Sequence, residues 1–97
     1  MNRNEILDFL KTHRETLRLD YGVQKIALFG SYARGNATDD SDIDIAVELT
    51  EAKKTLSNFF GLKRYLEAQL GQRIDLGIES AMKPAVRETA KQDMLHV

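Results

Sequence analysis

The chain has 97 residues, no cysteine, and 14 basic against 15 acidic side chains, which leaves a net charge of −1. This balance argues against general nucleic-acid binding, the absence of cysteine excludes disulfides and thiolate metal sites, and the length predicts a single domain over residues 1–97. Because no apolar run approaches the roughly 18 residues of a membrane helix and the N-terminus lacks the apolar core of a signal peptide, we expect a cytoplasmic protein that does not bind membranes.

The N-terminal segment has the spacing of an amphipathic helix. One face of this helix is expected to carry Ile6, Leu10, His13 and Leu17, which recur at intervals of three and four. Asn4 is the expected N-cap, and Gly22 is expected to end the segment. The run from 23 to 29 that follows has apolar residues on both faces. This pattern predicts a strand in the middle of a sheet.

Gly30 and Ser31 interrupt that strand at a point where a short helix can begin. Backbone N–H groups at the start of a helix suit an anion, the Ser31 hydroxyl can add a donor, and glycine lets the backbone approach a phosphate closely. Arg34 lies about one turn further on. Its guanidinium either binds the same phosphates or forms a surface salt bridge with Asp39 or Asp40.

Two further strands are predicted to carry acidic side chains on one face. From 42 to 49 apolar and polar residues alternate, so Asp42 and Asp44 share the face opposite the apolar residues. Their Cα atoms are then about 6.5 to 7 Å apart, which lets two carboxylates converge on one or two divalent cations. The segment 73–79 alternates in the same way and turns Asp75 to its polar face. A half-buried acidic strand beside a tight turn gives the same pattern without a function.

Between these two strands the sequence predicts a long helix. Thr50 is its expected N-cap and Gly71 its expected end, and Pro84 fits the first turn of a last helix after the third strand. The buried stripe expected for the long helix comprises Leu56, Phe59, Phe60, Leu66 and Leu70.

The motifs together carry a family resemblance. Gly-Ser at 30–31, Arg-Gly at 34–35, Ser-Asp-x-Asp at 41–44 and Ile-Asp-Leu at 74–76 resemble the nucleotidyltransferase superfamily typified by DNA polymerase beta. The likeness is greatest to the minimal nucleotidyltransferases, the small antitoxin partners of HEPN-domain toxins, and it covers nearly the whole chain. It implies an α/β (α+β) fold, in which helices pack mainly on one face of a small mixed β-sheet.

The resemblance also implies the roles of the acidic residues. Nucleotidyl transfer is an in-line attack of a hydroxyl on the α-phosphate of a nucleoside triphosphate, assisted by two Mg²⁺ ions. By the superfamily's pattern, Asp42 and Asp44 hold both ions, and Asp75 holds the ion that activates the attacking hydroxyl. Asp75 is also a candidate general base. The residues expected to bind the nucleotide are Gly30, Ser31 and Arg34.

The expected function is therefore Mg²⁺-dependent transfer of AMP from ATP to a hydroxyl. The resemblance implies that the acceptor is a tyrosine of a cognate HEPN toxin, which the modification silences. Two alternatives stay open: an antitoxin that acts by binding alone, with vestigial catalysis, and an enzyme that modifies a small-molecule hydroxyl. The short chain disfavours the second, because no residues remain for an acceptor pocket unless a partner or a second copy in an oligomer supplies one.

Overall fold

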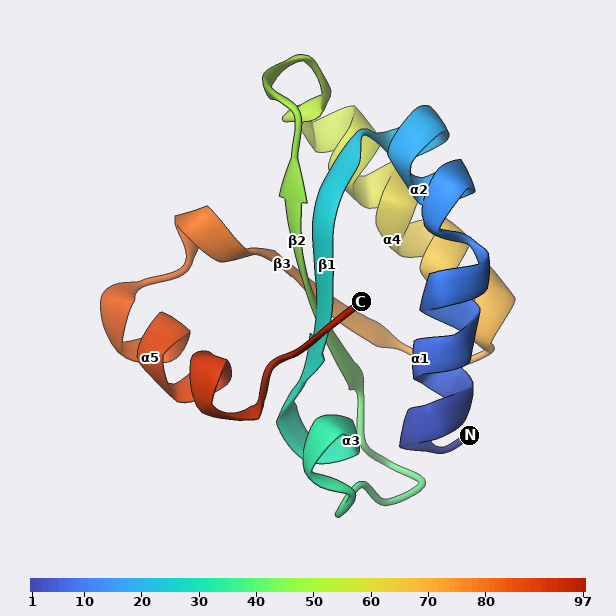
Figure 1. Cartoon of the computed structure of the whole chain (residues 1–97), viewed down its shortest axis with the longest axis vertical. Helices are drawn as coiled ribbons and strands as arrows, with labels where there is room; N and C mark the ends of the chain where they lie inside the picture. The colour runs from blue at the N-terminus through green and yellow to red at the C-terminus, as the bar shows by residue number, and fades with distance from the viewer.

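A four-stranded mixed sheet forms the centre of the structure, a computed structural model that describes residues 1–97 (Figure 1). Its strand order is β3-β2-β1-β4. The strands are β1 (Val23–Phe29), β2 (Ile43–Leu49), β3 (Ile74–Ile78) and β4 (Leu95–His96). The helices are α1 (Arg3–Thr12), α2 (Arg14–Tyr21), α3 (Gly30–Arg34), α4 (Leu56–Leu70) and α5 (Pro84–Asp93), with short 3₁₀ turns η1 (Glu51–Lys53) and η2 (Glu79–Ala81).

The pairing of the strands decides which side chains meet. β1 runs antiparallel to β2 and to β4, whereas β2 and β3 are parallel and are joined through α4. The register pairs Phe29 of β1 with Asp44 of β2, and Asp44 with Asp75 of β3. Since residues paired directly across strands share a face of the sheet, these three side chains form one row on the same face. The inner position of β1 confirms the central strand predicted for 23–29.

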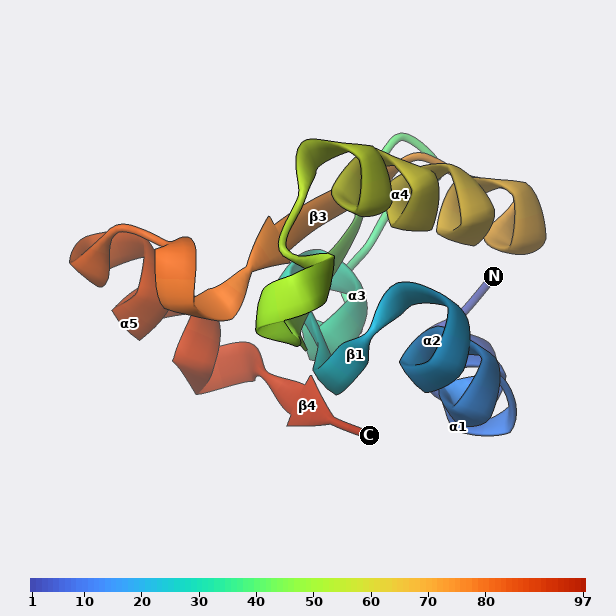
Figure 2. The ribbon, with the colours of Figure 1, turned by 90° about the horizontal axis from the view of Figure 1, so that it is seen from above.

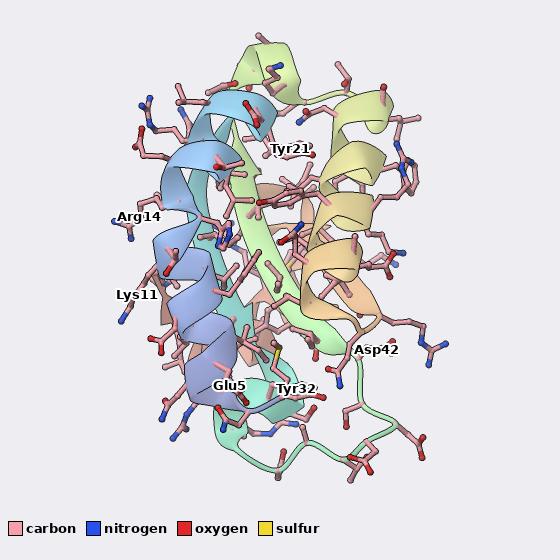
Figure 3. All side chains as sticks on the ribbon, turned by 90° about the vertical axis from the view of Figure 1, so that its right-hand side faces the viewer. Glu5, Lys11, Arg14, Tyr21, Tyr32 and Asp42 are labelled. Atoms are coloured by element: carbon pink, nitrogen blue, oxygen red, sulfur yellow. The ribbon has the colours of Figure 1, made fainter.

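The other face of the sheet carries the main core. Figures 1 and 2 show α1, α2 and α4 grouped on this face, with α5 on the opposite side of the strands. In Figure 3 the α1–α2 arm and α4 lie side by side in front of the sheet, Tyr21 points between them, and Lys11 and Arg14 point outward. The predicted arrangement, with helices mainly on one face, is confirmed. Fully buried core side chains include Ile6, Leu10, Leu17, Ile43, Ile45, Val47, Leu62 and Leu66.

The predicted start of the first helix is wrong. The N-cap of α1 is Asn2 and not Asn4. The Asn2 side chain accepts a hydrogen bond from the Glu5 N–H at 2.9 Å, and the Glu5 carboxylate accepts one from the Asn2 N–H at 3.0 Å. This reciprocal pair satisfies two amides that the first turn leaves free, and position 4 has no such partner. The first helix also divides at His13 into α1 and α2, while Gly22 ends the segment as predicted.

The long helix begins five residues later than predicted. Thr50 precedes the 3₁₀ turn η1, and Thr55 is the N-cap of α4, where its hydroxyl accepts from the Asn58 N–H at 3.1 Å. Gly71 ends this helix as predicted. The buried stripe is correspondingly narrower than expected. Leu66 and Leu70 are buried together with Leu62, and Phe59 is partly buried, but Leu56 is 76% and Phe60 48% exposed.

No helix has the length and the apolar character that crossing a membrane requires.

Candidate active site

Asp44 and Asp75 are the pair of predicted site residues that the fold brings together most directly. They occupy matched positions on the parallel strands β2 and β3, with Asp44 half-buried and Asp75 exposed. Burial first, and then the charge of Asp75, a hydrogen bond with Asp75 and the charge of Asp42, together raise the pKa of Asp44 from 3.8 to about 6, and the charge of Arg34 opposes them. Negative charge therefore gathers here without an equal positive charge from the protein.

Asp42 lies just before β2, and one of its carboxylate oxygens contacts Arg73. Its Oδ1 lies 3.2 Å from Nε of Arg73, and the two side chains are 44% and 81% exposed. A pair this exposed contributes little stability, so it leaves Asp42 free to turn. As the side chains stand, no group of three or more His, Asp or Glu residues is arranged to hold a metal ion. Metal binding by Asp42 therefore stays a prediction, and so do the roles proposed for the other site residues.

Gly30 forms the corner between β1 and the five-residue helix α3, with φ of +74°. A Cβ built on Gly30 would overlap Oδ2 of Asp44 and lie 2.9 Å from its Cγ. Sequence reasoning predicted a glycine here so that a phosphate could approach; the fold adds that Asp44 itself fills the space. Ser31 follows in the first turn of α3 and is partly exposed.

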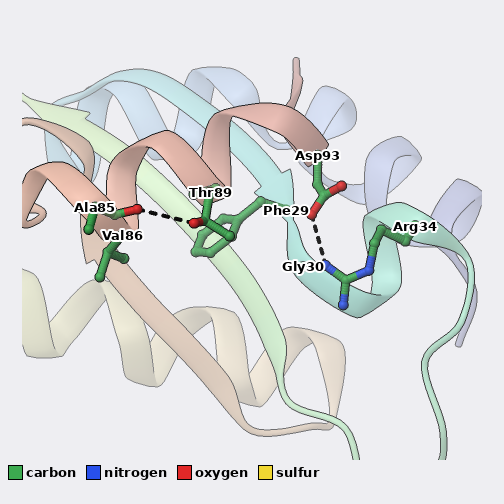
Figure 4. Close-up of a pocket in the computed structure, with 8 residues that line it drawn as sticks. Phe29, Gly30, Arg34, Ala85, Val86, Thr89 and Asp93 are labelled. Atoms are coloured by element: carbon green, nitrogen blue, oxygen red, sulfur yellow. Dashed lines mark hydrogen bonds and ion pairs between the residues drawn. The ribbon is translucent and has the colours of Figure 1, made fainter.

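Arg34 ends α3 and forms a salt bridge, but with neither of the two expected partners. Its Nη1 lies 2.8 Å from Oδ2 of Asp93, the last residue of α5 (Figure 4). The Arg34 side chain is 46% exposed, and its charge lowers the pKa of Asp44. The guanidinium is therefore close enough to act on the carboxylates and exposed enough to exchange Asp93 for an anion. Asp93 is the site-edge residue that the sequence analysis missed, because no local pattern marks it.

The residues fit a divalent cation by their chemistry. Carboxylate oxygens are the hard ligands that Mg²⁺ prefers, and a bound cation would favour the charged form of Asp44, which burial and the neighbouring carboxylates disfavour. Because Gly30 has no Cβ, the Asp44 carboxylate can lie directly against the corner between β1 and α3. Asp44 and Asp75 would hold such an ion, with Asp42 joining after its side chain leaves Arg73.

Neutralising Asp44 should stabilise the protein in the absence of divalent cations. Because the folded-state pKa of about 6 lies above the ordinary 3.8, the carboxyl favours folding while protonated, and stability falls as the pH rises from about 4 through 6. Asp44→Asn avoids this loss of stability because asparagine stays neutral at every pH. Allowing for solvent screening of a half-exposed group, we expect a gain of about 1 kcal/mol, or roughly 4 to 8 °C in Tm, at pH 7.5 with EDTA. Thermal melts should show the gap closing towards pH 4; a gap independent of pH would contradict the cause given.

The fold and the site define a class of protein. Residues 10–97 match the nucleotidyltransferase domain family, and the chain belongs to it. A predicted minimal nucleotidyltransferase of known structure aligns with a TM-score of 0.80 and 34% identity, over 98% of this chain and 95% of that chain. The chain is therefore an enzyme of the nucleotidyltransferase class with the fold of the minimal members of the family.

Two relatives narrow the comparison. Protein adenylyltransferase MntA of Thermococcus cleftensis is 42% identical over 93 residues, which cover 96% of this chain and 93% of that protein. A toxin–antitoxin complex crystallised with AMP-PNP contains a chain with a TM-score of 0.71 and 26% identity, over 99% of this chain and 72% of that one. The chain is thus similar to an adenylyltransferase and to a component of a toxin–antitoxin pair.

Proposed function

We propose that this protein transfers AMP from ATP to a hydroxyl of a partner protein and acts as the antitoxin of that partner. The observation that carries the proposal is the row of Asp44 and Asp75 beside the Gly30 corner, on the face of the sheet away from the main core. The similarity to an adenylyltransferase and to a toxin–antitoxin component supports the choice of acceptor. The family resemblance makes a tyrosine of a HEPN toxin the proposed target.

The proposed reaction assigns one task to each element of the site. The N–H groups at the start of α3 and the Ser31 hydroxyl hold the β- and γ-phosphates, and Arg34 releases Asp93 to join them. Asp75, the more exposed carboxylate, accepts the proton of the attacking hydroxyl. The hydroxyl oxygen bonds to the α-phosphorus as the bond to pyrophosphate breaks. Asp44, Asp75 and Asp42 would hold Mg²⁺, whose positive charge would offset the negative charge that develops during the transfer.

The test is the intact mass of the partner. When the purified toxin is mixed with this protein, ATP and Mg²⁺, its mass should rise by whole AMP units and its toxic activity should fall in parallel. Replacing ATP with α,β-methylene-ATP is the matched control, because that analogue cannot lose pyrophosphate from the α-phosphorus. A toxin silenced with no change of mass would contradict the proposal.

One observation favours a second candidate, an antitoxin that acts by binding alone. Asp42 contacts Arg73, and the acidic side chains do not stand ready as a three-residue metal cluster. A chain with weakened catalysis would show the same arrangement. The two candidates differ in one measurable respect, since only the enzyme needs a cleavable nucleotide to silence its partner.

A further inference from the structure

We infer that the pocket between α3 and α5 binds the nucleoside of the nucleotide substrate, which makes α5 the wall that recognises the base. The inference rests on the proposed function and extends it to residues of α5 that no motif marks. The pocket has a volume of about 420 Å³, within the range of small-molecule sites. Figure 4 shows it bounded by Phe29 and Gly30 on one side and by the α5 residues Ala85, Val86 and Thr89 on the other.

The position of the pocket ties it to the carboxylates. Gly30 lines the pocket, and the same residue lies directly against Asp44. Phe29, another lining residue, pairs with Asp44 across the β1–β2 ladder and therefore lies on the same face of the sheet. A nucleotide whose α-phosphate lies at Asp44 would have its sugar and base within reach of this pocket. The second large pocket, of about 350 Å³, is lined by Lys54, Leu56 and other residues at the far end of β2 and β3 and does not touch Gly30.

The chemistry of the walls sets the orientation of the nucleotide. Ala85 and Val86 present apolar surface, with Val86 52% exposed, while Ala90 further along α5 is buried, at only 5% exposed. The sole cation among the lining residues is Arg34, at the α3 side. A triphosphate is anionic and belongs beside Arg34 and the start of α3, whereas a purine is flat and largely apolar and gains most from the walls formed by Phe29 and α5.

Two opposite changes to the wall test the assignment. Ala85→Leu fills the pocket, and Val86→Asn removes apolar contact without adding charge. Both positions are exposed, so the helix should fold in each variant. Ala68→Leu, an exposed position on α4, repeats the alanine-to-leucine change on the opposite face of the sheet and serves as the control. Titration calorimetry of the full chain with Mg²⁺ compares α,β-methylene-ATP with inorganic tripolyphosphate, which has the phosphates and lacks the nucleoside.

We expect the wild type to bind α,β-methylene-ATP at least about tenfold more tightly than tripolyphosphate, a difference of about 1.4 kcal/mol. Both pocket variants should bind the nucleotide about tenfold more weakly and tripolyphosphate within about twofold of the wild type, and Ala68→Leu should match the wild type for both.

Three results would overturn the inference in distinguishable ways. If the variants keep full nucleotide affinity but modify the toxin more slowly, the pocket takes the acceptor side chain instead. If both probes weaken equally, the variants act on the phosphate site. If the wild type binds neither probe, the proposed nucleotidyl transfer falls together with this inference.

Discussion

Asp44→Asn should abolish AMP transfer to the partner, with a loss of about 10³-fold or more in initial rate. Asp44 is the central carboxylate of the site: it is matched with Asp75 across β2 and β3, Asp42 precedes it by two residues, and it packs on Gly30. Asparagine keeps the size of the side chain but lacks the charge that a cation needs. The measurement is the rate of mass gain of the toxin at saturating ATP and Mg²⁺.

The control for this variant is Asp40→Asn, which makes the same change in an exposed turn. It should retain wild-type activity, because Asp40 lies outside the sheet. The binding of each variant to the toxin must be measured at the same time. If Asp44→Asn silences the toxin as well as the wild type does at equal affinity, neutralisation depends on binding and the proposed enzymatic role of the antitoxin is wrong.

The acidic face of the sheet could be predicted because strand alternation is a local property. Apolar residues at every second position between 42 and 49 fix which side of the strand faces the core, and Asp44 must then face the other way. The same holds for Asp75. Alternation does not determine the register between the two strands, because a shift of two residues leaves every side chain on the same face of the sheet. The fold settles it by pairing Asp44 with Asp75 directly.

The features that were missed depend on contacts distant in sequence or on competing local signals. Arg34 and Asp93 are 59 residues apart, and their salt bridge exists only because α5 packs next to α3. Thr50 and Thr55 both have a side chain suited to an N-cap. A 3₁₀ turn lies between them, so Thr50 precedes that turn and Thr55 is the N-cap of α4. Phe60 is as hydrophobic as the core residues of α4. It lies two residues from the buried Leu62, which is about 200° around the helix, and therefore faces outward.

Gly30→Ala should remove most of the activity and lower stability. Two effects combine at this residue: the backbone has φ of +74°, which costs an L-residue about 1 kcal/mol, and the new Cβ meets the carboxylate of Asp44. Relief of that overlap requires Asp44 to move or the corner between β1 and α3 to open. A displacement of about 1 Å at a reacting group can cost about 10²-fold in rate, so we expect a loss of at least that size in toxin modification.

Gly35→Ala separates the two effects. Gly35 ends α3 with φ of +82°, and a Cβ there would have no neighbour within 4 Å. The variant therefore carries the same kind of backbone strain without touching Asp44. Thermal melts should show a similar loss of about 1 kcal/mol in both variants, with a further loss for Gly30→Ala from the overlap. Only Gly30→Ala should lose AMP transfer when rates are compared at a temperature where both are folded. Equal rates in the two variants would mean that the corner holds the chain in shape and that its contact with Asp44 plays no part in catalysis.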